Sequence, residues 1–142
     1  MMISARNQID AEVAGVSRDG VSALLRLRTA QGTEMYAAVT GEAADALALR
    51  DGDRVIAFFK ASHVLVATGW ALPISARNRL EGVIETVNHG VVSSEVRIRL
   101  CGGDRLSATV TEDAASNLAL EPGMNVVAIV KASDVMLAKN KK

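Results

Sequence analysis

The chain contains few of the residues that form cross-links, coordinate metals or stack on bases. It has one cysteine and two histidines among 142 residues. The single Cys101 excludes an internal disulfide, and His63, His89 and Cys101 are scattered, so that no two have the spacing of metal ligands. We therefore predict no metal site with direct protein ligands.

Net charge and long apolar runs are also absent. Sixteen basic residues balance sixteen acidic ones, so no net field attracts nucleic acid or an anionic membrane. The longest hydrophobic runs, such as 55–59, are far too short to span a bilayer, and we find no targeting signal. We expect a cytoplasmic protein without nucleic-acid or membrane partners.

Catalytic signatures are missing as well. We find no activated nucleophile, no plausible pair of catalytic carboxylates and no glycine-rich phosphate loop. The sequence therefore predicts a binding protein rather than an enzyme, and turnover of a phosphorylated substrate would overturn that prediction.

What the chain does contain is an internal repeat. Ile-Ser-Ala-Arg-Asn at 3–7 recurs at 74–78, and Lys-Ala-Ser at 60–62 recurs at 131–133, both with a period of 71 residues. We predict two domains, 1–68 and 72–142, joined by a connector at 68–73 that contains Gly69 and Pro73. Because a unit of about 70 residues buries little apolar surface alone, we expect a homo-oligomer.

Each repeat has a hydrophobic period of two over most of its length. Leu25 and Leu27 alternate with arginines, and four further segments of the first repeat alternate likewise, which predicts about five strands. The exceptions, 41–49 and 112–120, are rich in alanine and leucine and follow Thr40 and Thr111, which suit helix N-caps. Three strands, a helix and two strands is the order of an OB-type barrel. We predict an all-β fold of two tandem five-stranded OB-like barrels, each with one short helix.

Certain polar residues form an anion-binding set in each repeat. The first repeat offers the Ser4 hydroxyl, the Arg6 guanidinium and the Lys60 ammonium, and the helix after Thr40 offers free amides. The second repeat offers Ser75, Arg77, Lys131 and Thr111 in the same way. A doubly negative oxyanion would find two full charges and several directed donors in either set.

These motifs resemble a known family. The Ser-Ala-Arg-Asn opening, the threonine before a short helix and the Lys-Ala-Ser turn are similar to the Mop domain of the molbindins, and the tandem arrangement resembles the ModG type. Arg77-Asn78 followed by Gly82 fits the family spacing, whereas the first repeat has Ala11 at the glycine position. The resemblance implies a cytoplasmic homotrimer that binds molybdate or tungstate between chains, for molybdenum storage or homeostasis.

The resemblance also implies site residues. One side of a site would comprise Ser4, Arg6, Lys60 and Ala61, with Thr40 and the backbone near Ala43 on the other; the second repeat supplies Ser75, Arg77, Lys131, Ala132, Thr111 and Ala114. A further axial site would be lined by Gly20, Val21, Ser22, Gly90, Val91, Val92 and Ser93. The family often has serine where this chain has Ala43 and Ala114, and one lost hydrogen bond to a charged ligand costs about 1.5–3 kcal/mol.

Other interpretations remain open. Mop-like domains also occur in molybdate-responsive regulators and transporter ATPases, so a sensor or interaction module acting through a partner protein is the alternative. Arg26, Arg28, Arg97 and Arg99 form a basic strand face that is typical of a solvated surface, because an OB barrel that binds nucleic acid also needs aromatic stacking platforms. We expect the lysine-rich end, 139–142, to be a frayed tail.

Overall fold

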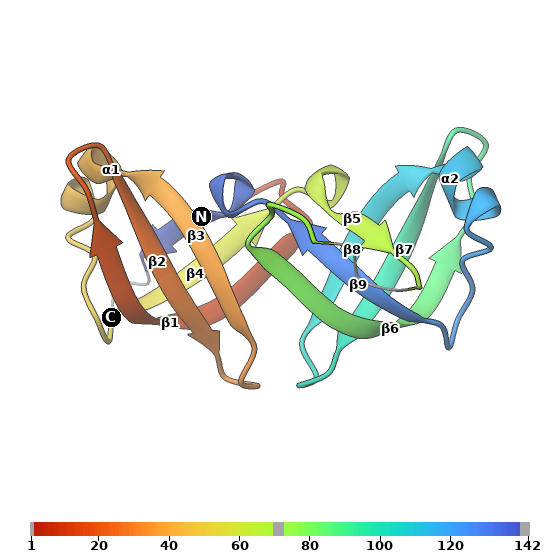
Figure 1. The fold of residues 1–142 in the computed structure, drawn as a ribbon, viewed down its shortest axis with the longest axis horizontal. Coiled ribbons are helices and arrows are strands. Elements are labelled where there is room, and N and C mark those ends of the chain that lie inside the picture. Colours follow the sequence, from red (N-terminus) through yellow and green to blue (C-terminus); the bar gives the residue numbers. More distant parts are fainter. Residues whose placement is uncertain (1, 70–72, 140–142) are drawn as a thin grey trace.

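The computed structural model describes residues 2–69 and 73–139, so Trp70, Ala71 and Leu72 of the predicted connector lie outside the described residues. Two five-stranded antiparallel sheets, each curled into a barrel, lie side by side (Figure 1). One α-helix lies at the outer end of each barrel, and the two are at opposite ends of the molecule (Figure 1). This architecture confirms the predicted all-β fold of tandem OB-like barrels.

The elements of both repeats follow the predicted order of three strands, a helix and two strands. The first repeat comprises β1 (Asn7–Arg18), β2 (Ser22–Thr29), β3 (Glu34–Thr40), α1 (Gly41–Ala46), β4 (Arg54–Phe59), the 3₁₀ helix η1 (Ala61–His63) and β5 (Leu65–Ala67). The second comprises β6 (Asn78–Asn88), β7 (Ser93–Leu100), β8 (Arg105–Thr111), α2 (Glu112–Asn117), β9 (Asn125–Val130), the 3₁₀ helix η2 (Ala132–Asp134) and β10 (Met136–Lys139). Within 2–69 and 73–139, no helix is long and apolar enough to cross a membrane.

The core follows from the alternation along the strands. Leu25 and Leu27 of β2 are fully buried while Arg28 is exposed, as a strand with one buried face requires. Phe59 and Met35 are also fully buried, and the buried side chains of the two barrels form one contiguous cluster. The barrels are therefore joined by packing as well as by the chain.

Both α-helices are shorter than the segments predicted for them, 41–49 and 112–120. They end where Ala48 and Ala119 adopt left-handed backbone conformations, with φ values of 49° and 51°. The next amides close the turn, since Leu49 N–H donates to Ala44 O and Leu120 N–H donates to Ala115 O, both at 3.0 Å. This is the bond pattern of a Schellman motif, in which glycine is the usual residue at the left-handed position. Because alanine occupies that position in both repeats, the sequence did not indicate where the helices end.

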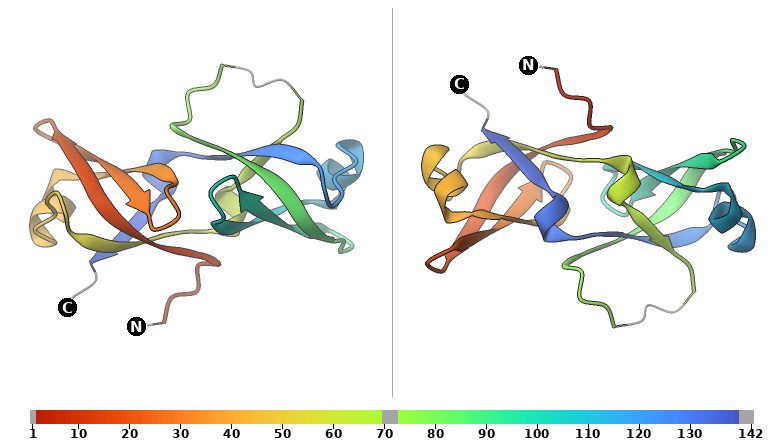
Figure 2. Two further views of the ribbon diagram at one scale, coloured as in Figure 1. Left: turned by 90° about the horizontal axis from the view of Figure 1, so that it is seen from below. Right: turned by 90° about the horizontal axis from the view of Figure 1, so that it is seen from above.

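The last strand of each repeat belongs to the sheet of the other repeat. One sheet has the order β10-β4-β1-β2-β3, and the other has the order β5-β9-β6-β7-β8. Met136 pairs with Phe58 of β4, and Leu65 pairs with Ile129 of β9. In Figure 1 the blue C-terminal strand thus completes the left barrel and the yellow-green β5 the right one; Figure 2 shows both crossings from above and below. The predicted division into 1–68 and 72–142 describes the two sequence repeats, whereas each barrel combines segments of both.

The expectation of a frayed end is wrong for Lys139, which belongs to β10. Its Nζ lies 3.2 Å from Asp53 Oδ2 and donates to the carbonyls of Leu47 and Ala48 at 3.1 Å. A cation at the end of α1 satisfies carbonyls that have no partner within the helix. Residues 140–142 lie outside the described part of the chain.

Because β10 of the second repeat completes the first sheet, we predict that the C-terminal end of the chain stabilises the first barrel. Deleting 136–142 removes the partner of one edge of β4 and the contacts of Lys139, but leaves β9 paired with β5. We expect hydrogen exchange of the β4 amides to become faster, while the β9 amides keep their protection. Mass spectrometry of the peptides that cover 54–59 and 125–130 measures both.

Deletion of 140–142 alone is the matched control and should change neither strand. Adding a peptide of residues 132–142 in trans should restore protection in β4. Equal loss of protection in β4 and β9, or none in either, would contradict the exchanged arrangement.

Candidate functional site

The predicted Arg6 and Lys60 lie at the same end of one strand pair. In the antiparallel pairing of β1 with β4, Asn7 is opposite Phe59, so the residues just beyond this pair are Arg6 and Lys60. Asn78 is opposite Val130 in the same way, which places Arg77 beside Lys131. In each repeat, strand pairing thus presents a guanidinium and an ammonium together at one edge of the barrel.

The turn after each lysine packs against the other repeat. Ala61 and Ala132 are buried and begin η1 and η2, whereas Ser4 and Ser75 are exposed near the arginines. η1 contacts β8, and η2 contacts β3. The turn that follows Lys60 therefore packs against β8, which ends at Thr111, and not against β3, which ends at Thr40. Within one chain the predicted grouping of Arg6 with Thr40 is not formed.

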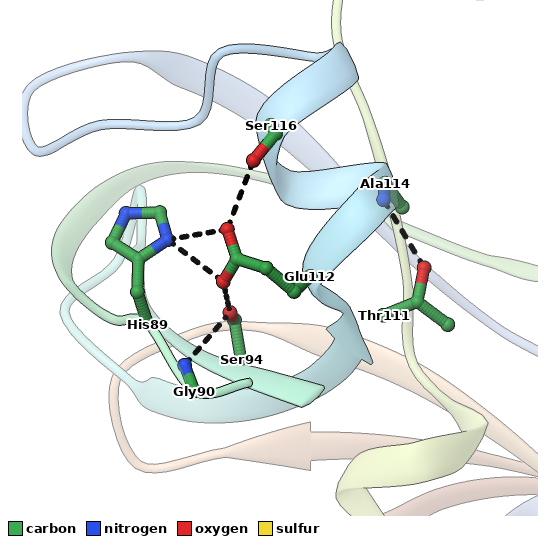
Figure 3. Close-up of polar contacts among 7 residues, drawn as sticks. All are labelled: His89, Gly90, Ser94, Thr111, Glu112, Ala114 and Ser116. Atoms are coloured by element: carbon green, nitrogen blue, oxygen red, sulfur yellow. Dashed lines mark hydrogen bonds and ion pairs between the residues drawn. The ribbon is translucent and has the colours of Figure 1, made fainter. Parts of the chain in front are cut away.

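The two threonines cap the helices as predicted. Thr40 Oγ1 accepts from the Ala43 amide at 3.0 Å. Thr111 Oγ1 accepts from the Ala114 amide at 3.1 Å, as Figure 3 shows. These amides are therefore engaged, and the helices have only six residues each, so the free donors expected at the helix starts are fewer than predicted. A groove of about 290 Å³ lies at the start of α2, and its lining includes Ser62, Thr111, Ala114 and Leu118.

The predicted axial residues occupy the tips of the β1–β2 and β6–β7 loops. Val21, Val91 and Val92 are 77%, 97% and 76% exposed. The amides of Ser22 and Val21 donate to Asp19 Oδ1, each at 2.7 Å, which holds the pKa of Asp19 below its usual range. In the first repeat an oxyanion at these amides would have to replace a carboxylate that already uses them.

A polar network joins the β6–β7 loop to the start of α2. The Glu112 carboxylate accepts from the hydroxyls of Ser94 and Ser116 and contacts His89 Nδ1 at 2.9 Å (Figure 3). The Ser94 hydroxyl, followed by His89 and Ser116, lowers the pKa of Glu112. The sequence showed only that His89 lacks the spacing of a metal ligand, and it did not predict this network.

In the first repeat a different ion pair joins the end of β1 to α1. Arg18 Nη1 donates to Asp45 Oδ1 at 2.8 Å, and Arg18 Nη2 donates to the carbonyl of Gly41 at 3.1 Å. This pairing lowers the pKa of Asp45 and raises that of Arg18. The two barrels therefore have equivalent loops held by different chemistry.

The asparagine of each Ser-Ala-Arg-Asn motif joins the two barrels. Asn7 accepts from the Ser107 amide at 2.7 Å and donates to the Ser107 carbonyl at 2.9 Å; Asn78 makes the same two bonds to Tyr36 at 2.7 and 2.8 Å. Both side chains are buried, and in a buried setting such paired bonds are costly to lose. These side chains thus satisfy backbone groups that belong to the other barrel rather than to their own neighbours in the sequence.

The arginines of the two motifs have different neighbours. Arg6 Nη1 lies 2.8 Å from Glu95 Oε2 on β7, whereas the Arg77 guanidinium lies over the ring of Tyr36, 5.2 Å from its centroid. Nothing in the repeated motif distinguished the two sites. Within 2–69 and 73–139 no three His, Cys, Asp or Glu side chains form a group that could hold a metal ion.

Comparison with known proteins identifies related chains. The model of the TOBE domain family matches residues 3–66 and 74–137. The molybdenum-pterin-binding protein MopB of Rhodobacter capsulatus is 40% identical over 138 residues, which cover 95% of this chain and 50% of MopB. The molybdenum transport protein ModE of Herbaspirillum seropedicae is 37% identical over 139 residues, covering 97% of this chain and 52% of ModE. The chain thus spans about half the length of these curated relatives.

One similar solved structure is matched over nearly its whole length. The cytoplasmic molybdate-binding protein ModG, in a form with molybdate bound, is 37% identical and superposes with a TM-score of 0.93. The match covers 97% of this chain and 99% of ModG. The similarity therefore includes the arrangement of the two barrels and not only the fold of each.

The Glu112 network predicts an acid-sensitive contact at α2. Because the folded-state pKa of Glu112 lies below its unfolded value, its contribution to stability is present above the ordinary carboxyl range and is lost as pH falls through the lowered folded-state pKa. Glu112→Gln cannot titrate, so this variant should lose less stability between neutral pH and about pH 3 than the wild type does. Denaturant unfolding at each pH, followed by circular dichroism, measures the difference.

Glu42→Gln is the matched control, because Glu42 lies in the first turn of α1 and its side chain makes no hydrogen bond to the described residues. This control should follow the wild-type pH dependence. A Glu112→Gln curve parallel to that of the wild type would show that the network does not contribute.

Proposed function

The chain belongs to the TOBE domain family, in the tandem Mop form of the molbindins, and we propose that it binds molybdate or tungstate at sites between subunits of a homotrimer. The observation that supports this most directly is the full-length similarity to ModG in its molybdate-bound form. Storage or homeostasis of molybdenum in the cytoplasm is its role, and binding and release are its whole mechanism, without catalysis.

The geometry of the arginine and lysine pairs supports an oxyanion ligand. A tetrahedral dianion needs positive charge and several directed donors, and Arg6 with Lys60 and Arg77 with Lys131 each supply two cations at one strand end. The arginines are exposed in the single chain, where water would weaken each contact. Contact with a second chain would exclude that water and add the Thr40 or Thr111 region of a neighbour. Incomplete sites on one chain are thus the reason to propose subunit interfaces.

We predict that Arg6→Ala together with Arg77→Ala abolishes tight molybdate binding. A hydrogen bond to a charged group contributes about 1.5–3 kcal/mol, so each site should become weaker by about 10- to 100-fold. Isothermal titration with molybdate, tungstate and sulfate measures affinity and stoichiometry, and native mass spectrometry measures the oligomer.

Arg54→Ala is the control, because Arg54 begins β4 and is thus at the opposite end of that strand from Lys60. Its molybdate affinity should equal that of the wild type, and all variants should retain the wild-type melting temperature within a few degrees. Unchanged affinity in the double variant would refute the assignment of these arginines.

The alternative is a sensor or interaction module that acts through a partner protein. The observation in its favour is that the chain corresponds to about half of MopB and ModE, so the same barrels occur within longer proteins. We predict that affinity capture recovers no stable partner that depends on molybdate. Recovery of one protein in molybdate but not in sulfate would favour the sensor function over storage.

A further inference from the structure

Divergence between the repeats places a carboxylate at only one of the two arginines. Glu95 Oε2 lies 2.8 Å from Arg6 Nη1, and the side chains are 22% and 60% exposed. The equivalent of Glu95, 71 residues earlier, is Leu24, which occupies the same place in its sheet because Leu24 pairs with Ala38 as Glu95 pairs with Thr109. The second-repeat arginine therefore has an apolar residue where the first-repeat arginine has an acid.

Arg77 is instead held by an aromatic ring. Its guanidinium carbon is 5.2 Å from the ring centroid of Tyr36, a cation–π contact that orients the group without neutralising it. No carboxylate of the described residues lies within ion-pair distance of Arg77; Asp51 and Arg26 line the same hollow, and Arg26 Nη1 lies 3.3 Å from Glu34 Oε1. Arg77 thus keeps its full charge for a ligand.

We propose that Glu95 weakens the oxyanion site of the first repeat, so that the two sites of each chain differ in affinity. This inference rests on the proposed function, since it concerns the same arginines. To bind at Arg6, a dianion must displace Glu95 from Nη1 and then remain near its negative charge. At Arg77 no carboxylate of the described residues is in ion-pair contact, so the ligand has no acid to displace there.

The contact between Arg6 and Glu95 is a competing ion pair rather than a support for the arginine. It joins one nitrogen to one oxygen and lies at a partly exposed position, where an ion pair is weak and contributes little to order. A ligand can therefore displace Glu95, at a cost in affinity. The second-repeat sites fill first and the first-repeat sites fill at higher concentration, which widens the range over which the protein buffers its ligand.

Single-arginine variants isolate the two sites. In Arg77→Ala only the first-repeat site remains intact, and in Arg6→Ala only the second-repeat site does. Calorimetric titration with molybdate should give an affinity about tenfold weaker for Arg77→Ala than for Arg6→Ala. Adding Glu95→Gln to Arg77→Ala should recover most of that factor, because the amide keeps the shape and removes the charge.

The reciprocal substitution, which introduces the acid beside Arg77, uses the other repeat as a matched control. Adding Leu24→Glu to Arg6→Ala should weaken the second-repeat site by about tenfold, because it places the same acid at the equivalent position. Native mass and melting temperature verify that each variant keeps the fold and assembly, and Glu95→Gln alone should raise the first-repeat affinity in the intact protein.

The outcomes separate this inference from the proposed function. A wild type that binds no molybdate overturns both. Binding in the wild type with equal affinities in Arg6→Ala and Arg77→Ala, or with no effect of Glu95→Gln, overturns the inference alone. Weaker binding in Glu95→Gln also overturns it, because Glu95 would then be a positioning residue that assists Arg6.

Discussion

The exchange of terminal strands is the constraint on which the rest of the structure depends. Neither repeat completes its own sheet, because β5 pairs with β9 and β10 pairs with β4. Each barrel of this small protein is thus closed by the other repeat, and the buried side chains of both form a single cluster. A repeat of this size has little core of its own, so sharing strands and core is a direct solution to marginal stability.

The same exchange determines which residues meet. Because the chain crosses to the other barrel after β4, Lys60 and η1 lie beside the second barrel, and Lys131 and η2 lie beside the first. Asn7 and Asn78 fix the crossing by binding Ser107 and Tyr36 through both backbone groups. The arginine that precedes each asparagine is carried to the same junction. The motif therefore combines a structural residue and a candidate binding residue in adjacent positions, and its repetition reflects both demands.

Local features of the fold were predictable from the sequence, and long-range pairings were not. Alternation such as that of Leu25 and Leu27 gave the strands, and Thr40 and Thr111 were correctly predicted as caps, because both signals depend on near neighbours. The partner of β10 depends on free strand edges far apart in the chain, which no periodicity records. Likewise Arg6 is adjacent to Glu95 only after both barrels form. One signal was available: Asn7 shares strand parity with Ile9, which places its amide on the buried face, where a polar group requires a partner.

Covalent linkage of the repeats has a physical consequence beyond stability. Two identical chains that exchanged strands would have identical sites, because every residue would occur at both symmetry-related positions. In a single chain the two positions can differ. Here Glu95 of the second repeat faces Arg6, whereas its equivalent in the first repeat is Leu24; Tyr36 of the first repeat supports Arg77, whereas its equivalent in the second repeat is Ser107. The loops differ too, with Arg18 and Asp45 in one barrel and His89 and Glu112 in the other. The two repeats share one fold and one arginine position but differ in the residues beside that arginine. Such differences allow the two sites to have different affinities, which a symmetric dimer of identical single repeats cannot have.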